Sequence, residues 1–480
     1  SILFMKNISA IFCVAAVALM ASCQLKDVEN PNITDKSFVG TTQSSSIWLN
    51  GMYRQLALTL NEVVSFTEIT SDNYYNNSSL SNKVFDIPTI LFSDLDVDNM
   101  QRAVGRLYQM AEYGINQVAP ADVTATNDIK AEMNFLGGYA CILASELYKG
   151  LPLEANGPVV SSGDILRKAI AYFDKAISLQ LDPNKKNNYT LAKARAYYNL
   201  GDRTNAQATA QTIITTAPTL VLNAVYDGIN GVSNTMQSNT FSSSTNTFAP
   251  LPRLDFLDPK YYHVGNASAD QKPVAILKGE EAFLIVAEAQ LGSNLLNDAR
   301  TTLKQLITNV VNARPTASVN AATQQRKGNR SDYPLLATVQ VKFDAASPAR
   351  SGFILDRQAG NITVKRVSGT SVKTTDIDAA GTKDELVYLL CLMRQEIFLS
   401  EGRRMTDLGI RFPISQVEKQ NNPNVTDAQT IATIPAYIPG QLGMDDFTYD
   451  RTAGIVTMKH DMNKVLVQQQ TAAGVLPLLK

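Results

Sequence analysis

Apolar residues recur three and four positions apart along most of the chain, which is the spacing of residues on one face of an α-helix. After Asp164, for example, Ile165, Ala169 and Phe173 fall on one stripe. The same spacing predicts helices over residues 46–60, 99–118, 127–148, 164–181, 190–200, 204–216, 277–291, 296–311 and 382–407. The chain is therefore predicted to be mainly α-helical.

Some of these helices come in pairs that resemble tetratricopeptide repeats, over about residues 164–218 and 277–311. In the first stretch Gly201 can open the turn between two helices, Ala206 allows their close approach, and Pro218 ends the second helix. Such pairs stack into a short superhelix that offers a surface to partners. Generic packing of helical hairpins is the alternative.

The helical spacing is lost elsewhere. Residues 228–272 are rich in Ser, Asn, Thr and Gly and predict a loop insertion, and residues 333–372 are irregular with a short β-like alternation from Ile362. Residues 408–480 contain several prolines and one predicted strand, 454–459, and are expected to form a loop-rich cover. We predict one domain, 23–480, in which tetratricopeptide-like helical repeats pack against an irregular loop-rich part.

The first residues have the character of a signal peptide, residues 1–22. A short basic start at Met5 and Lys6 precedes an apolar run that is too short to span a hydrocarbon core of about 30 Å. Ala21 and Ser22 then stand before Cys23, which resembles the lipobox of bacterial lipoproteins. Lipidation of Cys23 would anchor the protein to a membrane. An ordinary signal peptide with an incidental cysteine is the alternative.

Composition excludes several classes of function. Lys and Arg number 43 against 44 Asp and Glu, and no basic cluster stands out, so we expect no nucleic acid partner. The two histidines, His263 and His460, lie far apart, which argues against a histidine-rich metal site and a Ser-His-Asp triad. Once the leader is removed, Cys141 and Cys391 alone give no disulfide framework. We expect no cofactor, no metal and no catalysis.

Clustered carboxylates have structural interpretations. The acidic run 94–98 lacks the glycine and glutamate of a calcium-binding loop at Asn99 and Gly105, so it is interpreted as a helix cap. A glycosidase needs two carboxylates that face one bond, whereas three glutamates on one predicted helix are better interpreted as exposed or ion-paired: Glu280, Glu281 and Glu288. An internal ion-pair network is predicted for Arg394, Glu396, Glu401 and Arg404.

Two loops have the residues that bind sugars, because sugar C–H groups stack on aromatic rings and sugar hydroxyls need amide or charged partners. The predicted ligand-binding residues are Asp72, Asn73, Tyr74, Tyr75 and Asn76 in the first loop and Arg253, Tyr261 and Tyr262 in the second. Solvated turn residues are the alternative for the first loop. The single tryptophan, Trp48, lies on the apolar stripe of the first helix and is expected in the core.

Several motifs follow one another along the mature chain: Leu-x-Gly-x-Tyr within 46–56, Thr-Ser-Asp-Asn at 70–73, the helix end 107–116, Leu-Tyr-Lys-Gly-Leu-Pro-Leu at 147–153, the Arg- and Glu-rich 394–404, and Phe-Pro-Ile at 412–414. In this order they resemble the SusD/RagB family of Bacteroidetes outer-membrane lipoproteins. Met405 stands in place of the usual aromatic residue and Ser415 in place of a proline, which indicates a divergent branch.

The resemblance implies a cell-surface nutrient-binding lipoprotein, anchored in the outer membrane, that forms the lid of a SusC-like TonB-dependent β-barrel transporter. In that family the helical repeats face the barrel and the loops hold the nutrient. The implied cargo is an oligosaccharide. Peptide cargo stays an alternative because Trp48 leaves no spare tryptophan for a glycan platform. A tetratricopeptide-like scaffold that binds only protein is a further alternative.

Overall fold

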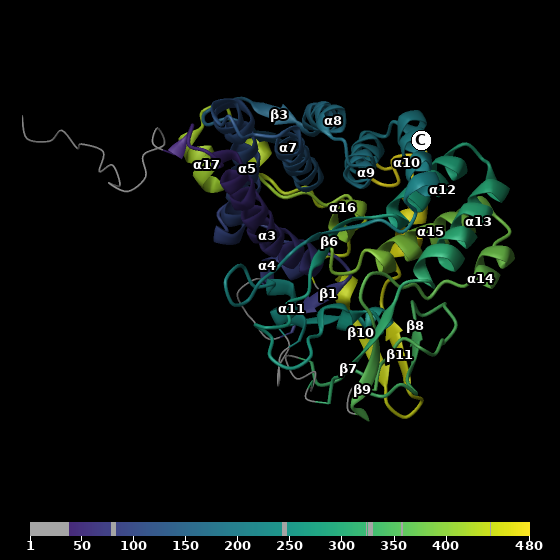
Figure 1. Ribbon diagram of the computed structural model, residues 1–480. Helices are drawn as coiled ribbons and strands as arrows, with labels where there is room; N and C mark the ends of the chain where they lie inside the picture. The colour runs from purple at the N-terminus through teal and green to yellow at the C-terminus, as the bar shows by residue number, and fades with distance from the viewer. Residues whose placement is uncertain are drawn as a thin grey trace, which may run out of the picture.

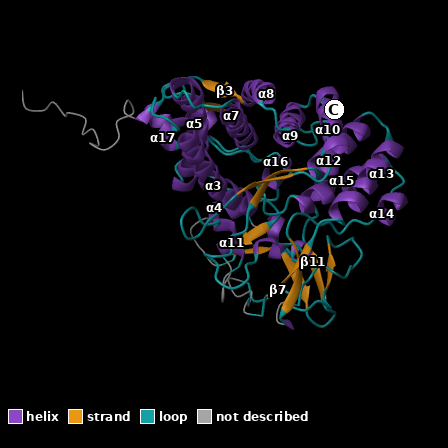
Figure 2. Cartoon of the chain, viewed as in Figure 1, coloured by secondary structure: helices purple, strands orange, loops and turns teal. Residues whose placement is uncertain are grey.

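In the computed structural model the described residues are 38–77, 83–241, 247–322, 324, 330–356, 359–441 and 443–480. The predicted signal peptide and Cys23 lie outside them. Helices occupy the upper part of the molecule as drawn in Figure 1, and most strands lie in the lower part, among loops (Figure 2). The mainly α class predicted from the sequence is confirmed.

The α-helices of the described residues are α3 (Ser44–Thr70), α4 (Lys83–Asp86), α5 (Leu95–Tyr113), α6 (Ala119–Ala121), α7 (Asn127–Leu147), α8 (Ser162–Leu179), α9 (Pro183–Leu200), α10 (Arg203–Thr216), α11 (Thr235–Thr240), α12 (Glu280–Gly292), α13 (Leu296–Gln305), α14 (Thr374–Ala379), α15 (Lys383–Ile397), α16 (Arg404–Asp407), α17 (Gln416–Asn421) and α18 (Met462–Gln468). Two π-helical stretches, Gly114–Val118 and Leu306–Val311, extend α5 and α13 to the predicted ends.

The strands are short and form small sheets. In antiparallel pairs, β1 (Tyr74–Asn76) lies beside β5 (Phe248–Pro250), β2 (Gly150–Pro152) beside β3 (Val159–Ser161), β4 (Val221–Ala224) beside β6 (Val274–Lys278), and β7 (Thr316–Asn320) beside β9 (Asn361–Lys365). The remaining sheet has the order β10 (Phe447–Asp450), β11 (Ile455–Met458) and β8 (Gln340–Lys342). Strands β9 and β11 confirm the two strands predicted from alternation.

Helices α7, α8, α9, α10, α12 and α13 follow one another in an arc, and each packs on the next (Figure 1). Gly201 ends α9 in the left-handed region, with a φ of 73°, which glycine adopts without strain. Asp202 then caps α10 by accepting a hydrogen bond from the backbone N–H of Asn205 at 3.1 Å. This is the turn predicted for the repeat, and helix pairs do stack in chain order.

Helices α7 and α8 approach each other closely at the first contact of the arc. α7 is buried along most of its length, and its Gly138 lies against the ring of Phe173 on α8. A Cβ at Gly138 would lie 2.5 Å from that ring, which is far closer than van der Waals contact. Glycine therefore sets how closely α7 and α8 approach.

Two predicted helices are interrupted in the structure. The predicted helix 277–291 begins only at Glu280, because Leu277 and Lys278 end β6 and Gly279 passes the chain of Pro218. A Cβ at Gly279 would lie 1.9 Å from the Pro218 carbonyl oxygen. The predicted helix 382–407 is wrong as one element: it divides into α15 and α16, and Ser400 and Gly402 between them have φ angles of 62° and 74°.

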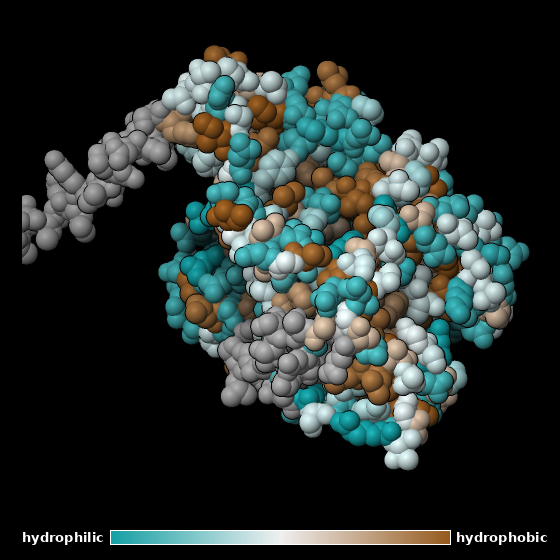
Figure 3. Space-filling model, turned by 60° about the horizontal axis from the view of Figure 1, so that its bottom comes forward, coloured by the Kyte–Doolittle hydropathy of each residue, from teal (hydrophilic) through white to brown (hydrophobic). Residues whose placement is uncertain are grey.

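The region 228–272, predicted to be a loop, contains regular secondary structure, namely α11 and β5. Trp48 is half-buried on α3: its ring packs against Tyr113 with centroids 5.1 Å apart, and its Nε1 donates to the Met110 carbonyl at 2.8 Å. Within the described part of the chain, no helix combines the length and hydrophobicity needed to cross a membrane. The face drawn in Figure 3 carries hydrophobic side chains in scattered patches among hydrophilic ones.

Replacing Gly138 with alanine should destabilise the protein by about 1–3 kcal/mol, because the added methyl group must displace the buried ring of Phe173. The matched control is Gly105→Ala, in the interior of α5, where an added Cβ meets nothing within 4 Å. Alanine there should stabilise the protein by up to about 1 kcal/mol. Chemical denaturation of both variants checks this. Equal effects at the two positions would contradict the tight α7–α8 contact.

Candidate functional site

The structure brings the two predicted ligand-binding loops together. Pairing of β1 with β5 places the residues around Asp72 beside Arg253, which donates a hydrogen bond to Asp72. Eight residues were predicted to bind ligand, and the exposed fraction of each is 5% or less: Asp72, Asn73, Tyr74, Tyr75, Asn76, Arg253, Tyr261 and Tyr262. The aromatic rings of these loops are therefore buried and do not face solvent.

Asp72 explains part of this burial. Its carboxylate accepts hydrogen bonds from Nε and Nη2 of Arg404 at 2.6 and 3.0 Å and also pairs with Arg253. Burial alone would raise the pKa of Asp72, but the charges of Arg404 and Arg253 outweigh burial and hold that pKa below its usual value. Asp72 is thus ionised and fully engaged by protein groups.

Two of the tyrosines hold the turn between α15 and α16. The hydroxyl of Tyr74 lies 2.7 Å from the Ser400 Oγ, and the hydroxyl of Tyr261 donates to the Ser400 carbonyl at 2.7 Å. Gly402 donates its N–H to Glu68 at 2.9 Å. These rings and polar groups are buried because they support a strained turn. Their role in ligand binding stays a prediction.

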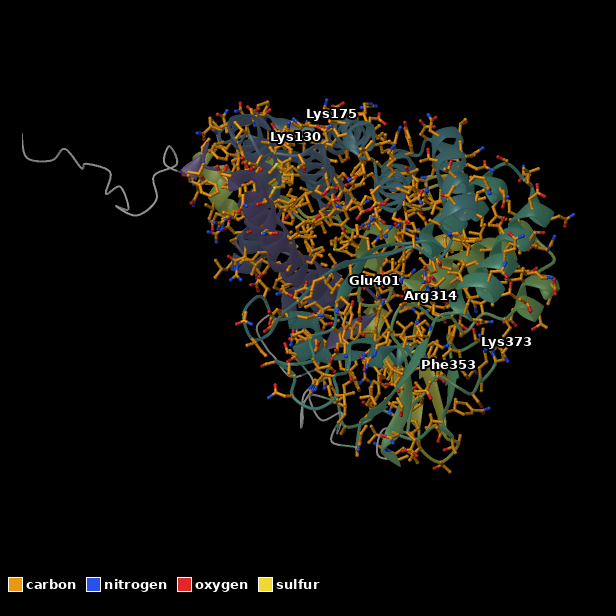
Figure 4. All side chains as sticks on the ribbon, in the orientation of Figure 1. Lys130, Lys175, Arg314, Phe353, Lys373 and Glu401 are labelled. Carbon is orange, nitrogen blue, oxygen red and sulfur yellow. The ribbon has the colours of Figure 1, made fainter. Side chains whose placement is uncertain are left out.

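Glu401, in the same turn, lies in the interior of the molecule (Figure 4). It accepts a hydrogen bond from Lys278 at 2.7 Å and another from Lys260. Burial lowers the pKa of Lys278 to about 8, although the Glu401 carboxylate opposes that shift. The predicted ion-pair network is therefore internal, but its members have partners on other elements: Arg394 with Asp407, Arg404 with Asp72, Glu401 with two lysines, and Glu396 with Thr370 and Ser371.

The clustered carboxylates have structural partners. Glu280 pairs with Arg314 at 2.8 Å and Glu281 with Arg403 at 2.5 Å, which confirms ion pairing, although both glutamates are buried. Asp94 caps α5 by accepting from the backbone N–H of Asp96, as predicted. Among the residues that the structure describes, no group of three or more His, Cys, Asp or Glu side chains is placed to hold a metal ion.

A cavity of about 520 Å³, lined by both polar and apolar side chains, lies where the ends of α7 and α9 and the start of α8 meet α16 and the C-terminal cover. Its lining residues come from segments far apart in the chain: Ser145, Glu146, Lys149, Ser162, Leu166, Tyr198, Asn199, Thr406, Asp407, Gly409, Arg411, Thr433, Pro435, Tyr437, Ala472, Ala473, Gly474, Leu476 and Pro477. Periodicity along the sequence could not reveal a site assembled in this way. We refer to it as the polar cavity.

One half-buried aromatic ring, Tyr437, stands in its wall. The Tyr437 hydroxyl donates to the Leu408 carbonyl at 2.9 Å. The next residue is Gly409, where a Cβ would lie 2.7 Å from that hydroxyl oxygen, so glycine leaves room for the tyrosine. The backbone at Leu408 and Gly409 therefore holds the Tyr437 ring in place.

Polar groups surround this ring. Arg411 donates through Nη1 to the carbonyl oxygens of Ile410 at 2.8 Å and Thr406 at 3.2 Å, which orients its guanidinium. Asn199 donates its amide to Glu146 at 2.8 Å. The lining of the polar cavity thus includes an aromatic ring, an amide and a guanidinium.

Both carboxylates of the polar cavity are already paired. Arg195 binds Glu146 through Nε at 2.7 Å and Nη2 at 2.6 Å, and Arg394 binds Asp407 at 2.8 Å. Burial alone would raise the pKa of Glu146, but the Arg195 charge outweighs burial and lowers that pKa to about 2. Glu146 therefore stays ionised and bound to Arg195 at neutral pH.

Glu288 lies behind the cavity wall. It accepts hydrogen bonds from the Tyr198 hydroxyl at 2.9 Å and from the backbone N–H of Leu478 at 3.0 Å. Burial raises the pKa of Glu288 to about 7, because these bonds and the nearby Arg394 only partly offset the loss of water. This glutamate fastens the end of the chain to α12.

Solved structures resemble this fold. A SusD superfamily protein from Bacteroides vulgatus aligns with a TM-score of 0.52 and 12% identity, covering 80% of this chain and 98% of that chain. A SusD superfamily protein from Bacteroides fragilis aligns with a TM-score of 0.51 and 13% identity, covering 81% of this chain and 100% of that chain. A candidate sugar-binding protein from Bacteroides vulgatus aligns with a TM-score of 0.51 and 13% identity, covering 81% of this chain and 98% of that chain. The SusD-like fold implied by the sequence motifs is confirmed.

Neither a family model nor a curated protein matches the sequence.

Replacing Asp72 with asparagine should destabilise the protein by about 3–5 kcal/mol, because the buried Arg404 would lose its carboxylate partner and the buried Arg253 would keep only its longer ion pair with Asp461 at 3.5 Å. The control is Asp174→Asn, whose half-exposed carboxylate pairs with Lys193 at 2.6 Å. That change should lower stability by less than about 1 kcal/mol. Urea unfolding at neutral pH measures both. A small effect at Asp72 would contradict a structural role for its charge.

Replacing Glu288 with glutamine should stabilise the protein at alkaline pH. Because the folded-state pKa is about 7, above the ordinary 4.5, the contribution of Glu288 to stability is greatest below pH 4.5 and is lost as the pH rises through 7. Glutamine stays neutral throughout. The unfolding temperature of Glu288→Gln should exceed that of the wild type by a few degrees at about pH 8.5, and this difference should shrink toward about pH 4.5.

Thermal unfolding across this pH range measures the difference, with the exposed Glu154→Gln as control. A difference that does not change with pH would show that folding does not raise the pKa of Glu288.

Proposed function

We propose that the chain is a member of the SusD/RagB family that binds an oligosaccharide at the cell surface and passes it to a SusC-like TonB-dependent β-barrel transporter in the outer membrane. In this proposal residues 1–22 are a signal peptide, Cys23 carries the lipid anchor, and residues 23–480 form one domain. The SusD-like fold supports the proposal, as do the sequence motifs of that family.

The observation that carries the binding function is the composition of the polar cavity on this fold. Tyr437 offers a ring for sugar C–H groups, and Asn199 and Arg411 offer partners for hydroxyl groups. The volume of about 520 Å³ lies within the range of about 300–1,000 Å³ that is usual for small-molecule sites. We therefore place the oligosaccharide in the polar cavity rather than at the buried tyrosines.

Transport would depend on binding and enclosure, without catalysis. The arc from α8 to α13 would face the barrel, as the family resemblance implies, and cargo held between the two proteins would be shielded from solution. Attachment by two or more acyl chains would keep the protein at the membrane, since one chain binds only marginally. Peptide cargo is the alternative that a binding experiment separates.

Calorimetric titration of residues 24–480 with neutral and acidic oligosaccharides and with a peptide pool should give saturable binding to a sugar. Tyr437→Ala should weaken that binding by at least about tenfold, because it removes the stacking surface. Tyr437→Phe keeps the ring and serves as the matched control. Binding to peptides alone would reassign the cargo, and sugar binding that survives Tyr437→Ala would place the site elsewhere.

A further inference from the structure

Two cationic side chains of the polar cavity have no carboxylate partner among the residues that the structure describes. Lys149 is exposed just after α7, and its amine forms no ion pair with any described residue. Arg411 uses Nη1 for two backbone carbonyls, while its Nε and Nη2 have no protein acceptor in the described chain. These N–H groups are the donors left for a ligand.

The carboxylates of the cavity do not cancel these charges. The carboxylates of Glu146 and Asp407 attract the charge of Arg411, but each of them already forms an ion pair with another arginine, Arg195 or Arg394. The C-terminal ends of α7 and α9 lie at the cavity, each with about half a negative charge, and so does the start of α8, with about half a positive charge. Together with the two cationic side chains these leave a surplus of about one and a half positive charges.

A second cavity of about 640 Å³ lies beside the first, and Lys149 and Thr433 line both. Its walls include Ser161 and Gln429, which can bond to hydroxyl groups. The chain 431–434 runs between the two cavities, joined to Arg411 by a β-bridge at Thr433. Lys149 therefore borders both cavities and can contact a ligand in either one.

We propose that the polar cavity selects anionic oligosaccharides, with a carboxylate or sulfate of the sugar bound by Arg411 and Lys149 while a ring stacks on Tyr437. This inference rests on the proposed oligosaccharide function and specifies its substrate class. Arg411 supplies the directed contact, because its guanidinium is fixed by the carbonyls of Ile410 and Thr406 and keeps two N–H donors on one edge. Lys149 supplies an unfixed charge at the rim.

The experiment compares acidic probes with neutral ones that have the same length. Residues 24–480 would be titrated with tetragalacturonate, tetramannuronate, a hyaluronan tetrasaccharide and a chondroitin sulfate tetrasaccharide. The neutral probes are methyl-esterified tetragalacturonate, maltotetraose and xylotetraose. We expect at least one acidic probe to bind and its neutral counterpart not to bind. Higher salt should weaken that binding, since screening reduces attraction between charges. The sulfated and carboxylated probes separate the two anion sources.

Two variants test the residues. Arg411→Gln should weaken acidic binding by about 10- to 100-fold, because it removes a hydrogen bond to a charged group. Lys149→Gln should weaken it by a few-fold, and folding is not at risk there because the amine has no partner among the described residues. The matched control is Lys175→Gln, on α8, where an exposed lysine points away from the molecule (Figure 4). That variant should bind like the wild type.

The outcomes separate the two proposals. Neutral sugars that bind as well as acidic ones, or acidic binding that is unchanged in Arg411→Gln and Lys149→Gln, would overturn anion selection and leave oligosaccharide binding in place. The absence of binding to any sugar would overturn the proposed function and this inference with it. Thermal unfolding of each variant shows that lost binding does not come from lost folding.

Discussion

The burial of one carboxylate, Asp72, between two arginines constrains most of the lower half of the molecule. Asp72 follows α3, Arg253 comes from the segment after β5, and Arg404 begins α16. Taking each charge out of water costs several kcal/mol, and the pairs among these three groups, together with the ion pair of Arg253 with the buried Asp461 at 3.5 Å, offset that loss. Three parts of the chain that are far apart in sequence must therefore fold together. These loops have the polar composition of surface loops, but they are buried and stabilise the fold as core residues do.

The same principle shapes the turn between α15 and α16. Ser400 has a φ of 62°, a left-handed conformation that a residue with a side chain adopts only under constraint from its surroundings. Around it, Glu401 is held by two lysines, Arg403 by Glu281, and the Ser400 carbonyl by Tyr261. The turn aims Arg404 at Asp72 and carries Asp407 to the wall of the polar cavity. Structural ion pairs and the candidate site are therefore built on one short segment.

Local signals in the sequence predicted the local structure. The start of α7 at Asn127 and the turn at Gly201 follow from spacing and from glycine, because a helix and its cap depend on neighbours a few residues away. The break after Ile397 could not be predicted in that way, since Thr382 to Asp407 has helical spacing throughout and the partners that interrupt it lie hundreds of residues away. The burial of Tyr74 and Tyr261 could not be predicted for the same reason: the composition of a polar loop does not show which distant segment covers it.

The polar cavity shows the same limit and indicates how the site would work. Its cover is held by contacts within the protein: Tyr437 bonds to Leu408, Arg203 donates to the Leu478 carbonyl at 2.8 Å, and the side chains of Val475 and Leu478 are fully buried. Walls that are already ordered leave little conformational entropy to lose on binding, so a modest number of contacts gives useful affinity. In the proposed function the body of the protein would then bind its sugar in a preformed site, and the movement needed for transport would lie between this protein and the barrel.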